Sequence, residues 1–159
     1  MTNIKSIPSV SVNYACNGSS TQANEMGMRA MQERAYEKRG EQYLLIKSPP
    51  ASGKSRALMF IALDKLYNQG LKKAIIVVPE KTIGASFNSE PLTQYGFWTD
   101  WEVAPQWNLC NAPGDDNGGK VGAVKAFLDS SDSILVCTHA TLRFAVDRFG
   151  VADFDDCLI

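Results

Sequence analysis

The stretch Ser48-Pro49-Pro50-Ala51-Ser52-Gly53-Lys54-Ser55 carries the strongest signal in the chain. It is close to the G-x-x-x-x-G-K-[ST] pattern of phosphate-binding loops, in which backbone N–H groups surround a phosphate. Glycine lets the backbone approach the ligand, lysine can reach the β- and γ-phosphates, and the following hydroxyl can bind Mg²⁺. We therefore predict that Pro50, Ala51, Ser52 and Gly53 bind a nucleotide, with Lys54 and Ser55 as the catalytic residues and Ser55 as the Mg²⁺ ligand.

Two positions depart from this pattern. Ser48 replaces its first glycine, and Ala51 stands where many such loops have a second glycine. The flanking residues supply the context that the pattern requires, because the apolar run Tyr43–Lys47 predicts a buried strand and Ser55–Asn68 predicts an amphipathic helix. A strand–loop–helix unit favours a nucleotide site over a structural turn. The predicted apolar stripe of the helix consists of Leu58, Ile61, Ala62 and Leu66.

Strands and helices alternate along the rest of the chain. Buried strands separated by helices are typical of an α/β fold with a mainly parallel sheet. Residues 1–24 are polar, and we expect an extended lead-in with Ser9–Tyr14 as a candidate strand. After them we predict helices at Glu25–Arg39, within Lys81–Phe97, at Val121–Leu128 and at Ala140–Phe149; strands at Lys73–Val78, at Ser133–Thr138 and from Cys157; an extended piece at Trp107–Cys110; and a loop at Asn111–Lys120.

Composition limits the other classes of function. Hydrophobic residues make up 45% and charged residues 21% of the 159 residues, which is ordinary for a globular protein. No apolar run approaches the roughly 20 residues of a membrane helix, and Met1–Tyr14 lacks the apolar core of a signal peptide, so we expect a cytoplasmic protein without membrane contact. The net charge of −1 neither supports nor excludes nucleic-acid binding. The four cysteines have no metal-ligand spacing and are expected as free thiols.

The loop and three further segments resemble superfamily 2 helicases of the DEAD/DEAH-box type, a family that includes restriction-enzyme-like ATPases. Ser48–Ser55 is similar to the loop "A-P-T-G-S-G-K-T" of that family, and Met28–Ala35 is similar to its "L-R-x-Y-Q-x-x-A" segment. Downstream, Ile75–Thr82 resembles motif Ia and Ile134–Leu142 resembles motif Ib. The resemblance implies a three-layer P-loop NTPase domain of the RecA-like kind, with ATP and Mg²⁺ as cofactors.

The resemblance also implies roles for residues outside the loop. Gln32 would recognise adenine, since an amide both donates and accepts hydrogen bonds. Pro79, Lys81 and Thr82 would contact the backbone of DNA or RNA, as would Thr138 and His139. Plainer alternatives stay open: Gln32 as a surface residue, Lys81 as a solvated residue at a helix start, and His139 as a structural side chain. His139 is the only histidine, which excludes a multi-histidine metal site.

In the same family, the strand after motif Ib ends in an acidic pair that holds Mg²⁺ and activates water. Phe154–Ile159 resembles the approach to that strand, but Asp155 and Asp156 precede the apolar residues and so lie at the wrong end. We therefore expect residues 25–159 to form the N-terminal part of a RecA-like domain, incomplete at its C-terminus and without its second RecA-like lobe. Such a fragment is expected to bind ATP and not to hydrolyse it alone.

Two other classes of function stay open from the sequence. A small-molecule kinase also uses this loop, although its loop usually lies near the N-terminus and some 47 residues precede it here. A non-enzymatic interaction module with a degenerate loop is the third class, and only the departures at Ser48 and Ala51 support it. The tryptophans Trp98, Trp101 and Trp107 could stack on bases, but packing in the core or at an interface is the favoured role.

Overall fold

The computed structural model describes residues 23–111 and 117–159, and within that part the sheet is small and parallel. Its strand order is β2-β1-β3, with β1 (Lys73–Val78) between β2 (Ile134–Thr138) and β3 (Cys157–Leu158). Strand β1 pairs with β2 over its last five residues, from Ala74↔Ile134 to Val78↔Thr138. It pairs with β3 at two positions only, Lys73↔Cys157 and Ala74↔Leu158. The candidate strand Ser9–Tyr14 lies outside the described residues.

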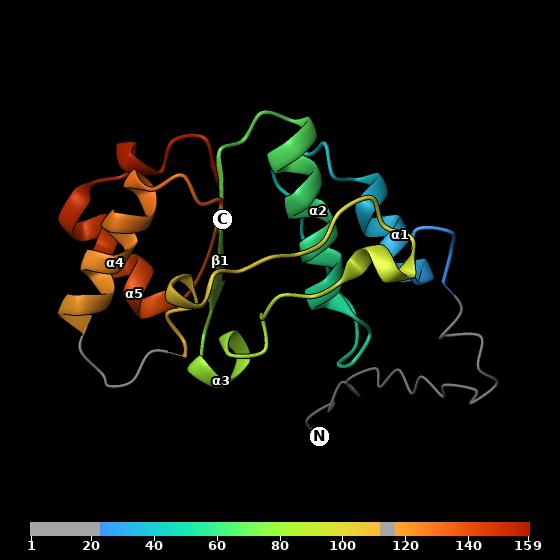
Figure 1. Cartoon of the computed structure of the whole chain (residues 1–159), viewed down its shortest axis with the longest axis horizontal. Coiled ribbons are helices and arrows are strands. Elements are labelled where there is room, and N and C mark those ends of the chain that lie inside the picture. Colours follow the sequence, from blue (N-terminus) through green and yellow to red (C-terminus); the bar gives the residue numbers. More distant parts are fainter. Residues whose placement is uncertain (1–22, 112–116) are drawn as a thin grey trace, which may run out of the picture.

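Helices cover both faces of this sheet and give the predicted α/β architecture (Figure 1). On one side of β1 lie α4 and α5, which pack against each other, and on the other side lie α1 and α2. The short helix α3 directly follows β1. The helices are α1 (Ala30–Glu37), α2 (Lys54–Asn68), α3 (Lys81–Gly84), α4 (Asn117–Asp129) and α5 (His139–Phe149), with 3₁₀ turns at η2 (Leu92–Tyr95), η3 (Pro105–Trp107) and η4 (Ala152–Phe154).

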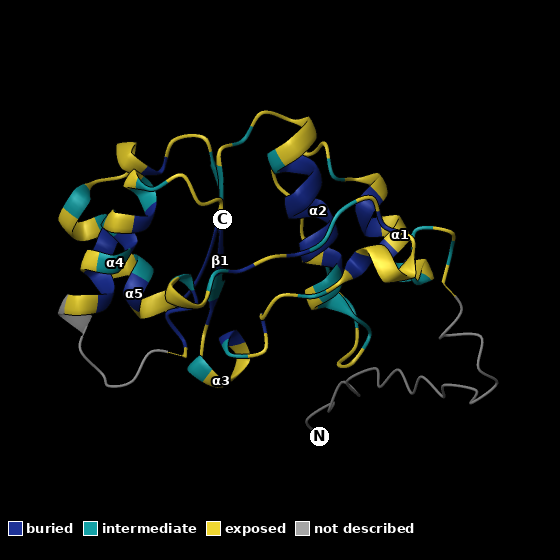
Figure 2. Cartoon of the chain, in the orientation of Figure 1, coloured by how far each residue is buried: buried dark blue, intermediate teal, exposed yellow. Residues whose placement is uncertain are grey.

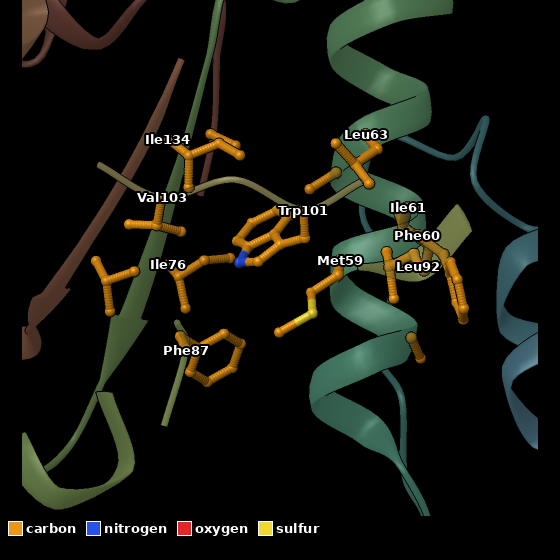
Figure 3. Close-up of a cluster of buried hydrophobic side chains, with 14 of the residues drawn as sticks. Met59, Phe60, Ile61, Leu63, Ile76, Phe87, Leu92, Trp101, Val103 and Ile134 are labelled. Carbon is orange, nitrogen blue, oxygen red and sulfur yellow. The ribbon is translucent and has the colours of Figure 1, made fainter. Parts of the chain in front are cut away.

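Side chains of β1 point alternately to the two faces of the sheet, so the buried side chains form two cores. The buried segments are dark blue in Figure 2. Ile76 and its neighbours on one face pack toward α2, whereas Ile75 on the other face packs toward α4 and α5. Trp101 is fully buried in the first core, where it lies between Ile76 and Met59 in Figure 3. Burial confirms the predicted packing role for Trp101. Trp98 is 43% exposed and meets the Tyr67 ring edge-on.

The segment Tyr43–Lys47 is not the buried strand that the sequence predicts. It has no strand pairing, and Tyr43 and Leu45 are 86% and 90% exposed. An apolar run becomes a strand only if a neighbouring strand accepts its hydrogen bonds. The neighbour available at this side of the sheet is β3, which has two residues. The prediction was therefore wrong for want of a partner strand.

The first helix is also shorter than predicted. The Asn24 side chain accepts hydrogen bonds from the N–H groups of Met26 and Met28 at 3.0 and 2.9 Å, which folds this stretch into a turn. Gly27 completes the turn with φ +76°, a conformation that glycine adopts without a Cβ clash. Helix α1 therefore begins at Ala30 and not at Glu25.

Other boundaries are confirmed, shifted or wrong. Strand β1 matches its predicted bounds, and α2, β2 and α5 lie within one residue of theirs. Helix α4 begins four residues early, at Asn117, and the helix predicted within 81–97 is reduced to α3 and η2. The predicted stripe of α2 is wrong at Leu58, which is 41% exposed, because the helix buries Met59, Phe60 and Leu63 instead.

Within the described ranges, Cys110, Cys137 and Cys157 are free thiols, as predicted. The extended piece at Trp107–Cys110 is confirmed in part, since Asn108 forms a parallel bridge with Val136 beside β2. None of the helices in the described part of the chain has the length and apolar character needed to cross a membrane.

Candidate functional site

The predicted phosphate loop leads directly into α2. Gly53 precedes the helix with φ +91°, in the left-handed region that glycine adopts most readily. A Cβ at this position would also lie 2.5 Å from Nε2 of Gln32, which is too close for two heavy atoms. The backbone conformation therefore favours glycine, and any Cβ here would also have to displace the end of the Gln32 side chain. Ala51 has φ +59°, so the position where many such loops have a second glycine is left-handed here too.

The N-terminus of α2 has the polarity that an anion requires. The first helical hydrogen bond runs from the Ala57 N–H to the Gly53 carbonyl at 3.1 Å, so the N–H groups of residues 54–56 have no partner within the helix. No acidic side chain lies in the first turn of this 15-residue helix. Aligned peptide dipoles add partial positive charge at the same end. The local fold therefore supplies donors and charge for a phosphate.

The Lys54 side chain folds back over the loop. Its Nζ donates to the carbonyls of Ser48 at 2.7 Å and Pro49 at 3.2 Å. Across the loop, the hydroxyls of Ser48 and Ser52 are hydrogen-bonded to each other, and the Ser52 N–H reaches the Pro49 carbonyl at 3.4 Å. The loop therefore closes around the ammonium group. Ser55, one residue further on, is exposed.

Gln32 connects α1 to this loop. Its side-chain oxygen accepts from the Arg29 N–H at 2.8 Å, and its Nε2 donates to the Gly53 carbonyl at 3.0 Å. The residue is 3% exposed, so the alternative of a surface glutamine is wrong. Protein atoms already use one acceptor site and one donor of the amide. A second lone pair and a second N–H remain for a ligand.

A pocket of about 480 Å³ lies between α1 and the loop. Pro50, Ala51 and Ser52 form part of its wall, as expected for a nucleotide site, whereas Lys54 and Ser55 are not among its lining residues. No acidic residue lines it. Three cationic residues also line the pocket and were not predicted from the sequence: Arg29, Arg34 and Lys47. Their signal was their position, since the two arginines flank Gln32 and the lysine directly precedes the loop.

The residues predicted to contact nucleic acid lie at or just after the carboxyl ends of two neighbouring strands. Val78 is paired with Thr138, so Pro79, Lys81 and Thr82 follow β1 at the level where His139 follows β2. Pro79, Thr82 and His139 are exposed, and Lys81 is half-buried. In Figure 1, α3 and the first turn of α2 lie toward the end of the molecule at which β1 finishes. The structure therefore gathers the predicted contacts at the carboxyl ends of the strands, where open α/β sheets bind ligands.

Thr138 has a structural task at this edge. It is the N-cap of α5, and its hydroxyl accepts from the Thr141 N–H at 3.4 Å. The two threonine hydroxyls lie 3.2 Å apart. A phosphate oxygen accepts hydrogen bonds, so a contact to it would use the Thr138 hydroxyl hydrogen, and it would compete with the bond between the two threonine hydroxyls.

The chain is similar to one segment of a longer bacterial protein. It is 54% identical over 150 residues to the protein of Bacillus subtilis (strain 168) named "Putative ATP-dependent helicase YeeB". The similarity covers 94% of this chain and 24% of the relative, so the chain spans about a quarter of the relative's length. No family model matches the chain, and no solved structure matches it.

Proposed function

We propose that this chain is the ATP-binding part of a nucleic-acid-dependent ATPase of the helicase or translocase class. The arrangement of Gly53, Lys54 and Ser55 at the start of α2 carries the proposal: a left-handed glycine, an ammonium held over the loop carbonyls and an exposed hydroxyl. These groups suit a triphosphate bound with Mg²⁺. The name of the 54% identical relative supports the helicase class.

In this proposal the parts of the loop have separate tasks. The N–H groups at the start of α2 bind the β-phosphate, and Lys54 exchanges its two carbonyl partners for phosphate oxygens. Ser55 provides a hydroxyl to Mg²⁺. Arg29, Arg34 and Lys47 line the adjoining pocket and place positive charge beside the rest of the nucleotide, whose adenine would meet the free donor and acceptor of Gln32.

We further propose that the chain alone binds ATP without hydrolysing it at a useful rate. Across residues 23–111 and 117–159, no group of three histidine, cysteine or acidic side chains is placed to hold a metal ion. Hydrolysis in P-loop enzymes uses a carboxylate on the metal and a residue that orients water. We assign those groups, and an arginine from a second RecA-like lobe, to the longer protein. Nucleic acid would bind along Pro79, Lys81, Thr82, Thr138 and His139.

Calorimetric titration with Mg-ATP tests the nucleotide site. We expect Lys54→Ala to weaken binding at least about tenfold, or ~1.4 kcal/mol, since it removes the charge over the phosphates. Lys72→Ala is the matched control, because Lys72 is exposed before β1 and its ammonium lies 3.9 Å from the exposed Asp156 carboxylate at the surface. Equal weakening in both variants, or equal affinity in all three proteins, contradicts the proposal. Absence of binding to every nucleotide would favour the interaction module.

A further inference from the structure

A second pocket, of about 420 Å³, lies at the C-terminal end of α2, away from the phosphate loop. Leu63 of α2 and Ile134 of β2 both line it, and Figure 3 shows them on opposite sides of the space between α2 and the sheet. Tyr67, also in its wall, follows Lys54 by 13 residues of continuous helix, or about 20 Å. None of the residues assigned above to nucleotide or nucleic acid lines this pocket, so it is a separate feature of the molecule.

The wall of this pocket is acidic. Asp100, Glu102 and Asp132 line it, whereas no arginine, lysine or histidine of the described residues does. None of the three carboxylates takes part in an ion pair with another described residue. Lys73 lies close by, but its ammonium donates to the Ser130 and Asp132 carbonyls at 2.9 and 2.6 Å. The last turn of α2 adds partial negative charge, so the pocket favours a cation.

Aromatic side chains form a second part of the wall, independently of the charge. Tyr67 and Trp98 are 67% and 43% exposed, and their rings meet edge-on with centroids 5.5 Å apart. Trp107 is half-buried, and its Nε1 donates to the Asp132 carboxylate at 2.6 Å, which places an indole beside a carboxylate. Indole faces attract cations. Tyrosine and tryptophan held in solvent are also enriched at protein interfaces, so these rings indicate a partner.

We propose that this pocket binds an arginine side chain from a basic segment of a partner protein. A guanidinium is planar, so it stacks on an aromatic ring while its N–H groups donate to carboxylates. The pocket supplies both kinds of group together, and its volume is in the range of cavities that bind a small ligand. A free polyamine would match the charge but has no planar group for the rings, which favours the protein segment. This inference does not rest on nucleotide binding.

The test titrates the 159-residue chain, without nucleotide, with the capped peptide Gly-Arg-Gly-Arg-Gly. NMR follows the indole N–H signals of the three tryptophans. We expect the signals of Trp98 and Trp107 to shift, whereas the fully buried Trp101 is the internal reference and shifts much less. The same peptide with citrulline, which keeps the shape of arginine and lacks its charge, should bind at least about threefold more weakly. Spermidine at equal concentration should also produce smaller shifts.

Two pairs of variants locate the binding in the pocket, and an unchanged Trp101 signal shows that each variant is folded. Glu102→Gln should weaken binding of the arginine peptide about threefold, while Glu80→Gln, an equal change of charge at the other end of β1, leaves it intact. Tyr67→Leu should also weaken binding, whereas Tyr43→Leu, at an exposed tyrosine outside the pocket, should not.

Three results overturn the proposal: no response to the arginine peptide, an equal response to the citrulline peptide, or an equal response to spermidine. The last would identify the pocket as a site for free polyamines. Equal weakening within either pair of variants also overturns it, because binding would then lie outside the pocket. Mg-ATP enters none of these measurements, so this proposal and the nucleotide site fail separately.

Discussion

Helix α1 is fastened to α2 at both ends, and the two attachments differ in strength. Near the phosphate loop, one amide makes the connection, from Gln32 Nε2 to the Gly53 carbonyl at 3.0 Å. At the far end, the Asp64 carboxylate accepts a hydrogen bond from Tyr36 and forms an ion pair with Arg39, both from the α1 region. Helix α1 is therefore held firmly at one end and lightly at the end where a ligand would bind.

The firm end is a closed network around Asp64. The carboxylate accepts from Gln69 Nε2 at 2.7 Å and Asn68 Nδ2 at 2.8 Å near the end of α2, and from Tyr36 Oη at 3.2 Å. It also forms an ion pair with Arg39 Nε at 3.2 Å. Arg39 also lies over the Tyr36 ring at 4.3 Å. A single hydrogen bond to a loop can open and close with a ligand, whereas a network of three hydrogen bonds and an ion pair resists opening. The loop end of α1 can therefore adjust to a ligand, whereas the end at Asp64 is rigid.

Removing the firm attachment has the largest expected effect. Asp64→Ala leaves three donors without their acceptor and Arg39 without its ion-pair partner, and Tyr36, which carries one of these donors, is buried. We expect the free energy of unfolding to fall by about 2–4 kcal/mol, measured by urea denaturation. Asp147→Ala, at an exposed aspartate of α5, should change it by less than about 0.5 kcal/mol. Equal losses in the two variants would show that the network contributes nothing specific.

Breaking the light attachment at Gln32 should lower stability by a smaller amount and should also weaken ligand binding. In Gln32→Glu, one carboxylate oxygen can still accept from the Arg29 N–H, but the other faces the Gly53 carbonyl and cannot donate. We expect a loss of about 1–2 kcal/mol in urea denaturation, together with weaker Mg-ATP binding. Gln106→Glu, on the exposed turn η3, is the control with the same change of charge. If Gln32→Glu lowers stability more than Asp64→Ala does, the comparison between the two ends is wrong.

In the loop itself, a substitution of Ala51 should raise the free energy of unfolding slightly. Its φ of +59° disfavours a residue with a Cβ, so Ala51→Gly relieves strain, while glycine adds freedom to the unfolded chain. We expect a net gain of about 0.5 kcal/mol, seen as a rise in the urea midpoint. Ala126→Gly, on the exposed face of α4, should lose about 1 kcal/mol by the same measurement. Losses of equal size at both positions would contradict the strain at Ala51.

The two attachments also show how far the sequence leads. The residues of the loop end were predictable, because Gly53, Lys54 and Ser55 form a contiguous motif whose chemistry is local. Asp64 gives no such signal, since its partners Tyr36 and Arg39 lie 28 and 25 residues away and meet it only after α1 packs on α2. The prediction of a strand at Tyr43–Lys47 failed for a related reason. Its apolar pattern is similar to that of β1, but its conformation depends on a neighbouring strand. The local sequence pattern predicted the structure correctly where the deciding contacts join residues close in sequence. It failed where a partner distant in sequence decides the conformation.

Acid should weaken the attachment of α1 at Asp64. Burial by itself raises the pKa of Asp64, but hydrogen bonds from Gln69, Asn68 and Tyr36 outweigh it and hold the pKa below its ordinary value. A depressed carboxyl pKa contributes stability that is complete above the unfolded value of about 3.9 and is lost as the pH falls through the lower folded value. The difference in unfolding free energy between the natural chain and Asp64→Asn should therefore shrink below about pH 4. Urea denaturation of both proteins between pH 7 and pH 3 measures this difference, and one that stays constant or grows on acidification would place the pKa of Asp64 at or above its ordinary value.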